Sequence, residues 1–330
     1  MTTSRRRILQ GLSASAVLAS APRALAAGSP PSLRTLAAGR PLIGAAVPNK
    51  FGTRLTEAAQ AVLTTHFDSV TPENCMKWQF LVPNENDYRW DPVDRLVALA
   101  EEHRQKVVGH TIIFNRKTNY PAWLFRDGGK EADAKLVWKR IESHFAKLVA
   151  RYQGRIDSWD VLNEFVEPHD PGYRQTDFTR VLGPEFPVRL FKLAAELDPK
   201  AKLTYNDFGI EDPKRRKPIL AFIRKLQDQG CRVDVIGSQS HLEVHHRIGE
   251  QIDATIKACA AIGVRCAFTE LDVDVVPRKL YWNPKTRPEA ITQNPYPNTC
   301  PEEVLQVQAE VYRDVFAAVM ANRKHVDRVT

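Results

Sequence analysis

The sequence predicts an α/β protein folded as a (β/α)8 TIM barrel, and three observations support this fold class. Short runs rich in β-branched and apolar residues alternate with longer segments of helical periodicity. Seven such units follow one another at even spacing, without a linker that would separate two domains. The 330 residues exceed the roughly 250 that a barrel of this kind needs.

The expected strands are residues 43–47, 69–73, 107–114, 156–163, 202–207, 233–241 and 265–272. Helical segments are expected near residues 53–66, 91–103, 132–152, 185–197, 213–229, 247–261 and 301–323. In the segment 132–152, large apolar residues recur at spacings of three and four, namely Trp138, Ile141, Phe145, Leu148, Val149 and Tyr152. This spacing places them on one helix face, which predicts that the helix packs against the sheet.

The eighth unit is expected to be largely absent. The seven units already occupy residues 43–326, and only Val329-Thr330 has the pattern of a further strand. We therefore predict that the last strand and the last helix are largely missing from this chain. Such a barrel would expose two strand edges and its apolar interior.

Residues 1–26 are predicted to be a signal peptide of the twin-arginine type. Arg5-Arg6-Arg7 precede a mildly apolar run, and residues 24–26 (ALA) match the small-residue cleavage pattern. An ordinary secretory signal with extra arginines is the alternative. Residues 27–40 are expected to be a leader and residues 41–330 the barrel. The protein is thus expected to be exported, to the periplasm or the extracellular space.

Composition excludes several partners. The net charge of +8 falls to +4 without the four arginines of residues 1–26, so no nucleic-acid partner is expected. No later stretch is apolar enough to span a membrane after signal cleavage. The five cysteines lack metal-ligand spacing, so no metal is expected. Cys259 and Cys266 are close enough in sequence for a disulfide bond. Separately, the protein is expected to be a monomer.

Polar side chains lie towards the carboxyl ends of nearly all the expected strands. They are Glu73, Asn74, His110, Asn163, Glu164, Asn206, Asp207, Gln239, His241, Glu270 and Asp272. Barrel enzymes carry their chemistry at the carboxyl ends of the strands. Burying so many polar groups is unfavourable unless they bind one another or a polar ligand. The pattern therefore predicts a polar site at this end of the barrel.

Two glutamates in this set predict the chemistry. Glu164 ends the fourth expected strand and Glu270 the seventh, so their carboxylates can converge from opposite sides. Cleavage of a glycosidic bond uses such a pair, in which one carboxyl protonates the leaving oxygen and the other attacks the sugar or activates water. The alternative is that each glutamate is a local ion-pair partner. Because each stands beside a further polar residue, catalysis is favoured.

Five motifs are similar to those of family 10 glycoside hydrolases, most of which are endo-β-1,4-xylanases. They are residues 71–78 (TPENCMKW), 109–111 (GHT), 159–164 (WDVLNE), 237–242 (GSQSHL) and 269–272 (TELD). The resemblance extends from about residue 40 to the end of the chain. It implies a catalytic barrel that hydrolyses xylan or xylo-oligosaccharides by a retaining double displacement without a cofactor.

The resemblance also implies individual roles. Glu164 would be the general acid/base and Glu270 the nucleophile. His241 would hydrogen-bond the Glu270 carboxylate, and Asp272 would polarise His241. Asn163 would bind the sugar 2-hydroxyl.

Further residues would bind substrate or support the site. Asn206 would support the acid/base. Glu73, Asn74 and Lys77 would bind the non-reducing side of the substrate, with His110 and Gln239 near the scissile sugar. Trp78 is either a sugar-stacking ring or a buried one.

Phe114 and Asn115 depart from the family, which has Trp and His at these positions. Both would line the subsite of the cleaved sugar, which predicts an altered substrate preference or rate. Two alternatives to a xylanase stay open. One is a β-glycosidase of other specificity on the same barrel, altered through Phe114 and Asn115. The other is a catalytically compromised carbohydrate-binding remnant, because the C-terminal unit is expected to be absent.

Overall fold

The computed structural model describes residues 31–330 apart from 39–40, 49–54, 169–171, 246–247 and 279–293. The predicted signal peptide and residues 27–30 of the predicted leader lie outside the described residues. Residues 33–37, at the end of that leader, form helix α1 (Leu33–Ala37). Helix α1 is tied to the barrel because Arg34 forms an ion pair with Asp68 at 3.3 Å.

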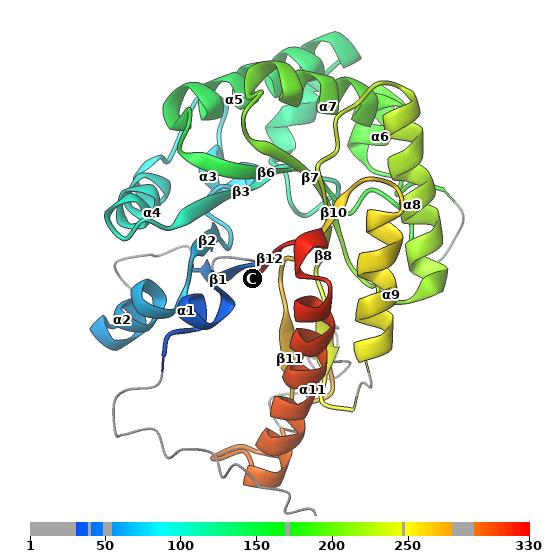
Figure 1. Cartoon of the computed structure of the whole chain (residues 1–330). Coiled ribbons are helices and arrows are strands. Elements are labelled where there is room, and N and C mark those ends of the chain that lie inside the picture. The colour runs from blue at the N-terminus through cyan, green and yellow to red at the C-terminus, as the bar shows by residue number, and fades with distance from the viewer. Residues whose placement is uncertain (1–30, 39–40, 49–54, 169–171, 246–247, 279–293) are drawn as a thin grey trace, which may run out of the picture. The chain divides into compact units, whose positions relative to one another are not determined.

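Eight parallel strands close into a barrel (Figure 1). Around the barrel they are β1 (Leu42–Val47), β12 (Val326–Val329), β10 (Arg265–Phe268), β8 (Val235–Ser238), β7 (Lys202–Asp207), β6 (Ile156–Asn163), β3 (Lys106–Phe114) and β2 (Ser69–Pro72). The seven expected strands and the fold class are confirmed. The runs 233–241 and 265–272 end earlier than expected, and their continuations form a separate parallel pair, β9 (His241–Glu243) with β11 (Asp272–Asp274).

The eighth strand is present, so the prediction of a largely missing strand with two exposed edges is wrong. Strand β12 pairs with β1 through Arg328 and Val329 and with β10 through Val326 and Val329. The strand was difficult to predict from the sequence because two of its four residues, Asp327 and Arg328, are charged. Both are only 1% exposed, since each finds oppositely charged partners inside the barrel.

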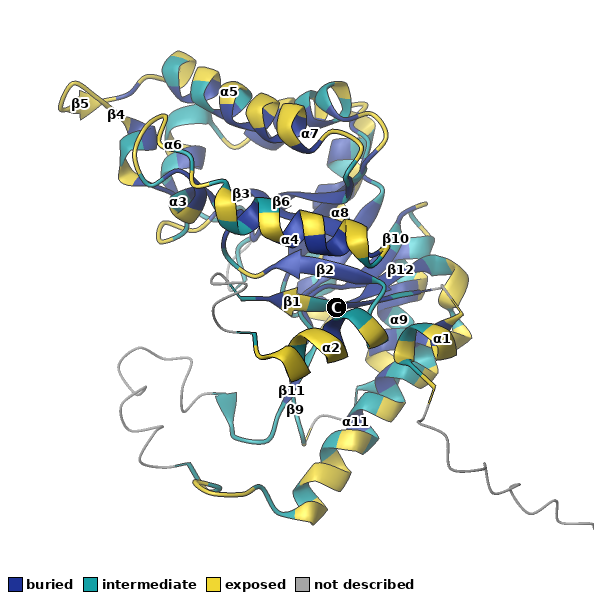
Figure 2. Cartoon of the chain, turned by 90° about the vertical axis from the view of Figure 1, so that its left-hand side faces the viewer, coloured by how far each residue is buried: buried dark blue, intermediate teal, exposed yellow. Residues whose placement is uncertain are grey.

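Helices cover the outside of the barrel, with their buried faces towards the strands (Figure 2). They are α2 (Glu57–His66), α3 (Trp78–Leu81), α4 (Asp91–Glu102), α5 (Ala134–Tyr152), α6 (Asp177–Leu182), α7 (Phe186–Leu197), α8 (Pro213–Asp228), α9 (Gly249–Ala260) and α11 (Glu302–Ala321). Short 3-10 turns at Ala122–Phe125 and Arg323–His325 and a small hairpin of β4 (Arg126–Asp127) and β5 (Lys130–Glu131) complete the structure. Helix α5 starts where the Asp133 carboxylate accepts the Leu136 N–H at 2.7 Å.

The apolar face of α5 is buried as its periodicity predicts. Its Phe145 ring packs edge-on against Trp159 of β6, with ring centroids 5.6 Å apart. Gly109 of β3 makes room for this indole, because a Cβ atom there would lie 2.1 Å from the Trp159 ring. The contact fixes the strand that ends in Asn163 and Glu164.

Two further observations concern membrane spans and disulfide bonds. Over the described part of the chain, no helix has both the length and the hydrophobicity that crossing a membrane requires. All five cysteines are free thiols, so the bridge considered for Cys259 and Cys266 is not formed.

Candidate active site

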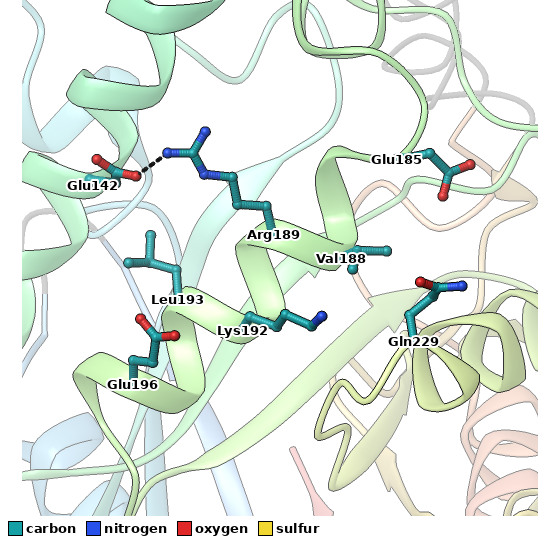
Figure 3. A pocket seen from close by; sticks show the side chains of 8 residues that line it. All are labelled: Glu142, Glu185, Val188, Arg189, Lys192, Leu193, Glu196 and Gln229. Atoms are coloured by element: carbon teal, nitrogen blue, oxygen red, sulfur yellow. Dashed lines mark hydrogen bonds and ion pairs between the residues drawn. The ribbon is translucent and has the colours of Figure 1, made fainter.

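A cavity of about 770 Å³ opens at the carboxyl ends of the barrel strands. Six of the predicted site residues line it, namely Glu73, Lys77, His110, His241, Glu270 and Asp272. A second hollow of about 700 Å³ lies outside the barrel along α7, where Arg189 pairs with Glu142 (Figure 3). None of the predicted site residues lines this second hollow. The first cavity therefore contains the predicted nucleophile Glu270, whereas Glu164 is not among its lining residues.

Glu270, which follows Thr269 after the end of strand β10, is held by two donors. Its Oε2 lies 3.2 Å from His241 Nε2, and its Oε1 accepts a hydrogen bond of 3.0 Å from Asn206 Nδ2. Burial raises the pKa of Glu270, but the His241 hydrogen bond and the charges of His110, His241 and Lys77 outweigh it and lower the pKa to about 2. Glu270 is therefore ionised at neutral pH, as a nucleophile requires.

His241 connects Glu270 to Asp272. Its Nδ1 lies 3.2 Å from each carboxylate oxygen of Asp272. Burial lowers the pKa of His241, but the hydrogen bonds to Asp272 and Glu270 raise it to about 9. Both ring nitrogens consequently carry protons at neutral pH and donate to the two carboxylates, in the arrangement that the sequence predicts.

The shifted pKa values predict how stability depends on pH. The pKa of His241 is 6.5 in its ordinary state and about 9 in the fold, so its stabilisation is complete below pH 6.5 and is lost as the pH rises through 9. The pKa of Glu270 falls from 4.5 to about 2, so its stabilisation is present above pH 4.5 and is lost as the pH falls through 2. We expect His241→Asn to lower the free energy of unfolding most between pH 4.5 and 6.5, and least above pH 9.

Urea unfolding across this pH range measures the difference between wild type and variant. The matched variant His103→Asn, at the end of α4, should show no such pH dependence. An effect of His241→Asn that is equal at pH 6 and pH 10 would contradict the charged state of His241.

Glu164, directly after strand β6, has a different environment. Its side chain is only 5% exposed. Its Oε1 accepts a hydrogen bond of 3.2 Å from Gln239 Nε2, whereas its Oε2 faces two guanidinium groups, those of Arg174 at 3.4 Å and Arg116 at 3.7 Å. The two glutamates thus differ: one is open to the large cavity, and the other lies under two arginine side chains.

The backbone at Glu164 is in the left-handed region, with φ of 57°, which is unfavourable for a residue with a side chain. Surrounding hydrogen bonds maintain it. The N–H groups of Phe165 and Val166 donate to the Tyr205 hydroxyl at 3.2 and 3.1 Å, and Arg174 Nε donates to the Glu164 carbonyl at 3.1 Å. The chain turns sharply here, which directs the Glu164 carboxyl towards Gln239.

A buried network behind this turn was not predicted from the sequence. The Tyr205 hydroxyl donates to Asp207, and Arg215 donates to Asp207 at 2.7 Å and to the Val166 carbonyl at 2.9 Å. Burial raises the pKa of Asp207 to about 6, although Arg215 and Tyr205 oppose the shift. The only signal in the sequence is the polar pair Asn206-Asp207 at the end of a strand.

Asn206 and Gln239 each contact both glutamates, one through the backbone carbonyl and the other through the side chain. The Asn206 carbonyl accepts the Glu164 N–H at 2.9 Å, while its side chain binds Glu270. The Gln239 carbonyl accepts the Glu270 N–H at 3.1 Å, while its side chain binds Glu164. Asn206 thus contacts Glu164 through its backbone carbonyl, whereas its side chain holds Glu270. The arrangement also gives Gln239 a supporting contact that was not predicted.

The remaining predicted residues on the substrate side fall into two groups. Lys77 donates to Asn74 Oδ1 at 2.9 Å, and its Nζ lies 5.4 Å from the centre of the half-buried Phe114 ring, so these three residues form one wall with the exposed Glu73. Burial lowers the pKa of Lys77, although the charges of Glu270, Glu73 and Glu164 oppose this. Asn163, by contrast, is fully buried. Its Nδ2 is buried and has no hydrogen-bond partner among the described residues.

The structure decides between the two alternatives for Trp78 and contradicts the predicted position of Asn115. Trp78 is 2% exposed and stacks on His144 with ring centroids 4.2 Å apart, so it is the buried ring and not a sugar platform. Asn115 is 0% exposed, and its Oδ1 accepts a hydrogen bond of 2.6 Å from Thr176. Its side chain therefore supports the loop instead of lining the subsite.

His110 is oriented by residues that the sequence did not single out. Its Nδ1 lies 2.8 Å from Asp160 Oδ2, and Asp160 Oδ1 accepts a hydrogen bond of 3.1 Å from Arg328 Nη2. Asp160 and Arg328 are each 1% exposed. A charged residue inside a buried strand is the signal that could have identified Asp160, since such a group requires a partner.

The closed barrel with two differently held carboxyl groups at its strand ends defines a glycoside hydrolase. The profile of glycosyl hydrolase family 10 matches residues 32–330, and the chain belongs to this family. Endo-1,4-beta-xylanase B of Paenibacillus barcinonensis is 33% identical over 91% of this chain and 86% of its own. Endo-1,4-beta-xylanase A of Xylanibacter ruminicola is 35% identical over 81% of this chain and 73% of its own.

Solved structures agree with these sequence relatives. The structure of a GH10 endoxylanase retrieved from a sugarcane soil metagenome superposes with a TM-score of 0.83 at 31% identity. That likeness covers 91% of this chain and 86% of the other chain. The protein is accordingly an enzyme, a glycoside hydrolase of this family.

Proposed function

We propose that the protein is a retaining endo-β-1,4-xylanase that hydrolyses internal β-1,4-xylosidic bonds of xylan. The observation that carries the proposal is the asymmetry of the two carboxyl groups. Glu270 is kept ionised by its His241 hydrogen bond and by the charges of His110, His241 and Lys77. Glu164 is only 5% exposed, and its Oε1 accepts a hydrogen bond from Gln239. One ionised and one shielded carboxyl group match the nucleophile and the acid of a double displacement. The xylanases among the relatives support the choice of substrate.

In the first step, the Glu270 carboxylate attacks the anomeric carbon while Glu164 transfers its proton to the leaving oxygen. The glycosidic bond breaks, and an ester forms between the sugar and Glu270. In the second step, Glu164 takes a proton from water, and the resulting hydroxide displaces Glu270. Two inversions leave the anomeric configuration unchanged, and both glutamates regain their starting protonation.

Neighbouring residues bind the sugar that is cleaved. The unpartnered Asn163 Nδ2 is a donor for its 2-hydroxyl, a contact that strengthens in the transition state. Lys77 and His110 present charged or polar atoms on the cavity side of Glu270. The chemistry needs only these side chains and water, so we propose that no cofactor takes part and that the monomer is active.

We further propose that the enzyme acts outside the cytoplasm. Its polymeric substrate is too large to cross a membrane, and the arginines and apolar run of residues 1–26 match an export signal. Cleavage near Ala27 would then release the barrel to the periplasm or the medium.

The proposal is tested on soluble neutral xylan, by following reducing ends and viscosity together. We expect viscosity to fall well before most bonds are cut, because internal cleavage shortens chains rapidly. Proton NMR should show the β-anomer as the first product. An α-anomer would exclude the retaining mechanism. Faster cleavage of a β-1,4-glucan than of xylan would assign a different substrate, in line with the changed Phe114 position.

A further inference from the structure

Two arginines cover the carboxyl group of Glu164. Arg116 follows strand β3, and Arg174 comes from the loop before α6. Their guanidinium groups lie 3.7 and 3.4 Å from the same oxygen, Glu164 Oε2. Glu164 is the only carboxylate within ion-pair distance of Arg116 in the part of the chain that the structure describes. One negative group therefore faces two positive groups.

The hydrogen-bonding capacity of this cluster is incomplete. Arg174 Nη2 and Glu164 Oε2 are both buried, and neither has a hydrogen-bond partner among the described residues. Arg174 uses its Nε on the Glu164 carbonyl, which fixes its position. Arg116 is 49% exposed, so its guanidinium group is open to solvent. The pair thus offers N–H donors, one held in place and one exposed, beside Glu164.

The reaction makes the charge imbalance larger. Glu164 must carry a proton when it acts as the acid, and it is then uncharged. The two guanidinium groups would lose their counter-ion in the Michaelis complex, and partly buried cations without a counter-ion are unfavourable. An anionic group on the substrate would replace the lost charge. It would also draw Arg116 away from the oxygen that has to reach the leaving group.

We propose that Arg116 and Arg174 form a binding site for the carboxylate of a uronic acid branch on the substrate chain. The inference rests on the proposed function and specifies which form of the polysaccharide the enzyme prefers. A carboxylate presents two oxygens in the plane of the guanidinium N–H groups, so paired hydrogen bonds can form with each arginine. The site therefore distinguishes acidic from neutral chains next to the scissile bond.

The test compares two xylo-oligosaccharides of equal length, one with a single glucuronic acid branch and one with that branch reduced to glucose. The readout is the ratio of kcat/KM for the acidic to the reduced substrate, which cancels effects common to both. We expect a ratio of about ten in the wild type, and a ratio close to one in Arg116→Gln. The wild-type ratio should also fall as salt is raised. The matched variant Arg189→Gln, on the outer face of α7, should keep the wild-type ratio.

Arg174 is tested by a conservative change, since it also holds the Glu164 backbone. Arg174→Lys should lower the ratio less than Arg174→Gln, because the ammonium keeps the charge without the paired donors. A wild-type ratio near one would overturn the proposal. So would a ratio that is unchanged in Arg116→Gln.

A binding measurement separates failure of this inference from failure of the proposed function. Calorimetry with Glu270→Ala compares the affinities of the same two oligosaccharides without turnover. Tighter binding of the acidic one, lost in the double variant with Arg116→Gln, supports the anion site even if the enzyme cleaves neither. Equal affinities in a protein that hydrolyses xylan would overturn the anion site alone.

Discussion

Replacing Glu270 with alanine is expected to lower kcat on xylan by about 10⁴-fold or more. The variant has no group to form the ester with the sugar, and the loss of a catalytic nucleophile has effects of this order. The Lys77 and His241 charges that keep Glu270 ionised would instead face an empty space in the cavity. Reducing-sugar release under saturating substrate measures the loss.

Azide tests whether Glu270 is the nucleophile, which the loss of kcat alone does not show. In Glu270→Ala the alanine leaves space on the face that the nucleophile occupied, and azide entering there should give an α-glycosyl azide from a β-linked substrate. This is a single displacement, so the configuration inverts. An azide product of retained configuration would contradict the assignment of Glu270.

Glu164→Ala is the matched control for this experiment. With an activated aryl glycoside, the first step needs no acid, so the ester with Glu270 still forms. Azide then attacks the ester in place of activated water and should yield the β-glycosyl azide. Opposite configurations from the two variants would distinguish nucleophile from acid/base, whereas identical configurations would not fit the double displacement.

Replacing Trp159 with alanine is expected to lower the free energy of unfolding by about 3–5 kcal/mol. The indole is 1% exposed, packs on Phe145 and donates from its Nε1 to Asp198 at 3.0 Å. Removing it leaves a cavity between β6 and α5 and deprives the buried Asp198 of a donor. Urea unfolding measures the change as a lower midpoint.

Trp159→Phe separates the two contributions. The phenyl ring retains most of the apolar contact but cannot donate to Asp198, so a loss of about 1–3 kcal/mol is expected. Gly109→Ala provides an independent check, because its Cβ would collide with the same ring. Equal stability of Trp159→Ala and wild type would show that the ring does not hold β6 in place.

Seven strands and the two glutamates could be predicted from the sequence, because each depends on local order. Hydrophobic runs of four to nine residues predict buried parallel strands. A polar residue directly after such a run must lie at the carboxyl end of the barrel. Glu164 and Glu270 follow from this rule. The contact of His241 with Glu270 and Asp272 was implied by the resemblance to the family, and the structure shows it.

Side-chain direction could not be predicted in the same way. Trp78 lies within an expected site motif and Asn115 was expected to line a subsite, yet both are buried away from the cavity. Asn206 and Gln239 bind the glutamates in an arrangement that depends on the stagger between neighbouring strands. A position after a strand says which end of the barrel a residue occupies, but not which neighbour its side chain meets.

The sequence by itself determined the barrel, the order of its strands and the pair of carboxyl groups, since periodicity and strand-end position are properties of short segments. Only the tertiary structure showed that strand β12 closes the barrel and that two arginines lie over the Glu164 carboxyl group. Arg328 is accepted inside the barrel because Asp160, 168 residues earlier, neutralises it. Arg116 and Arg174 meet at Glu164 from two different loops. Buried charges of this kind are stable only when residues distant in the sequence neutralise them in the fold. A short sequence segment contains no sign of those partners.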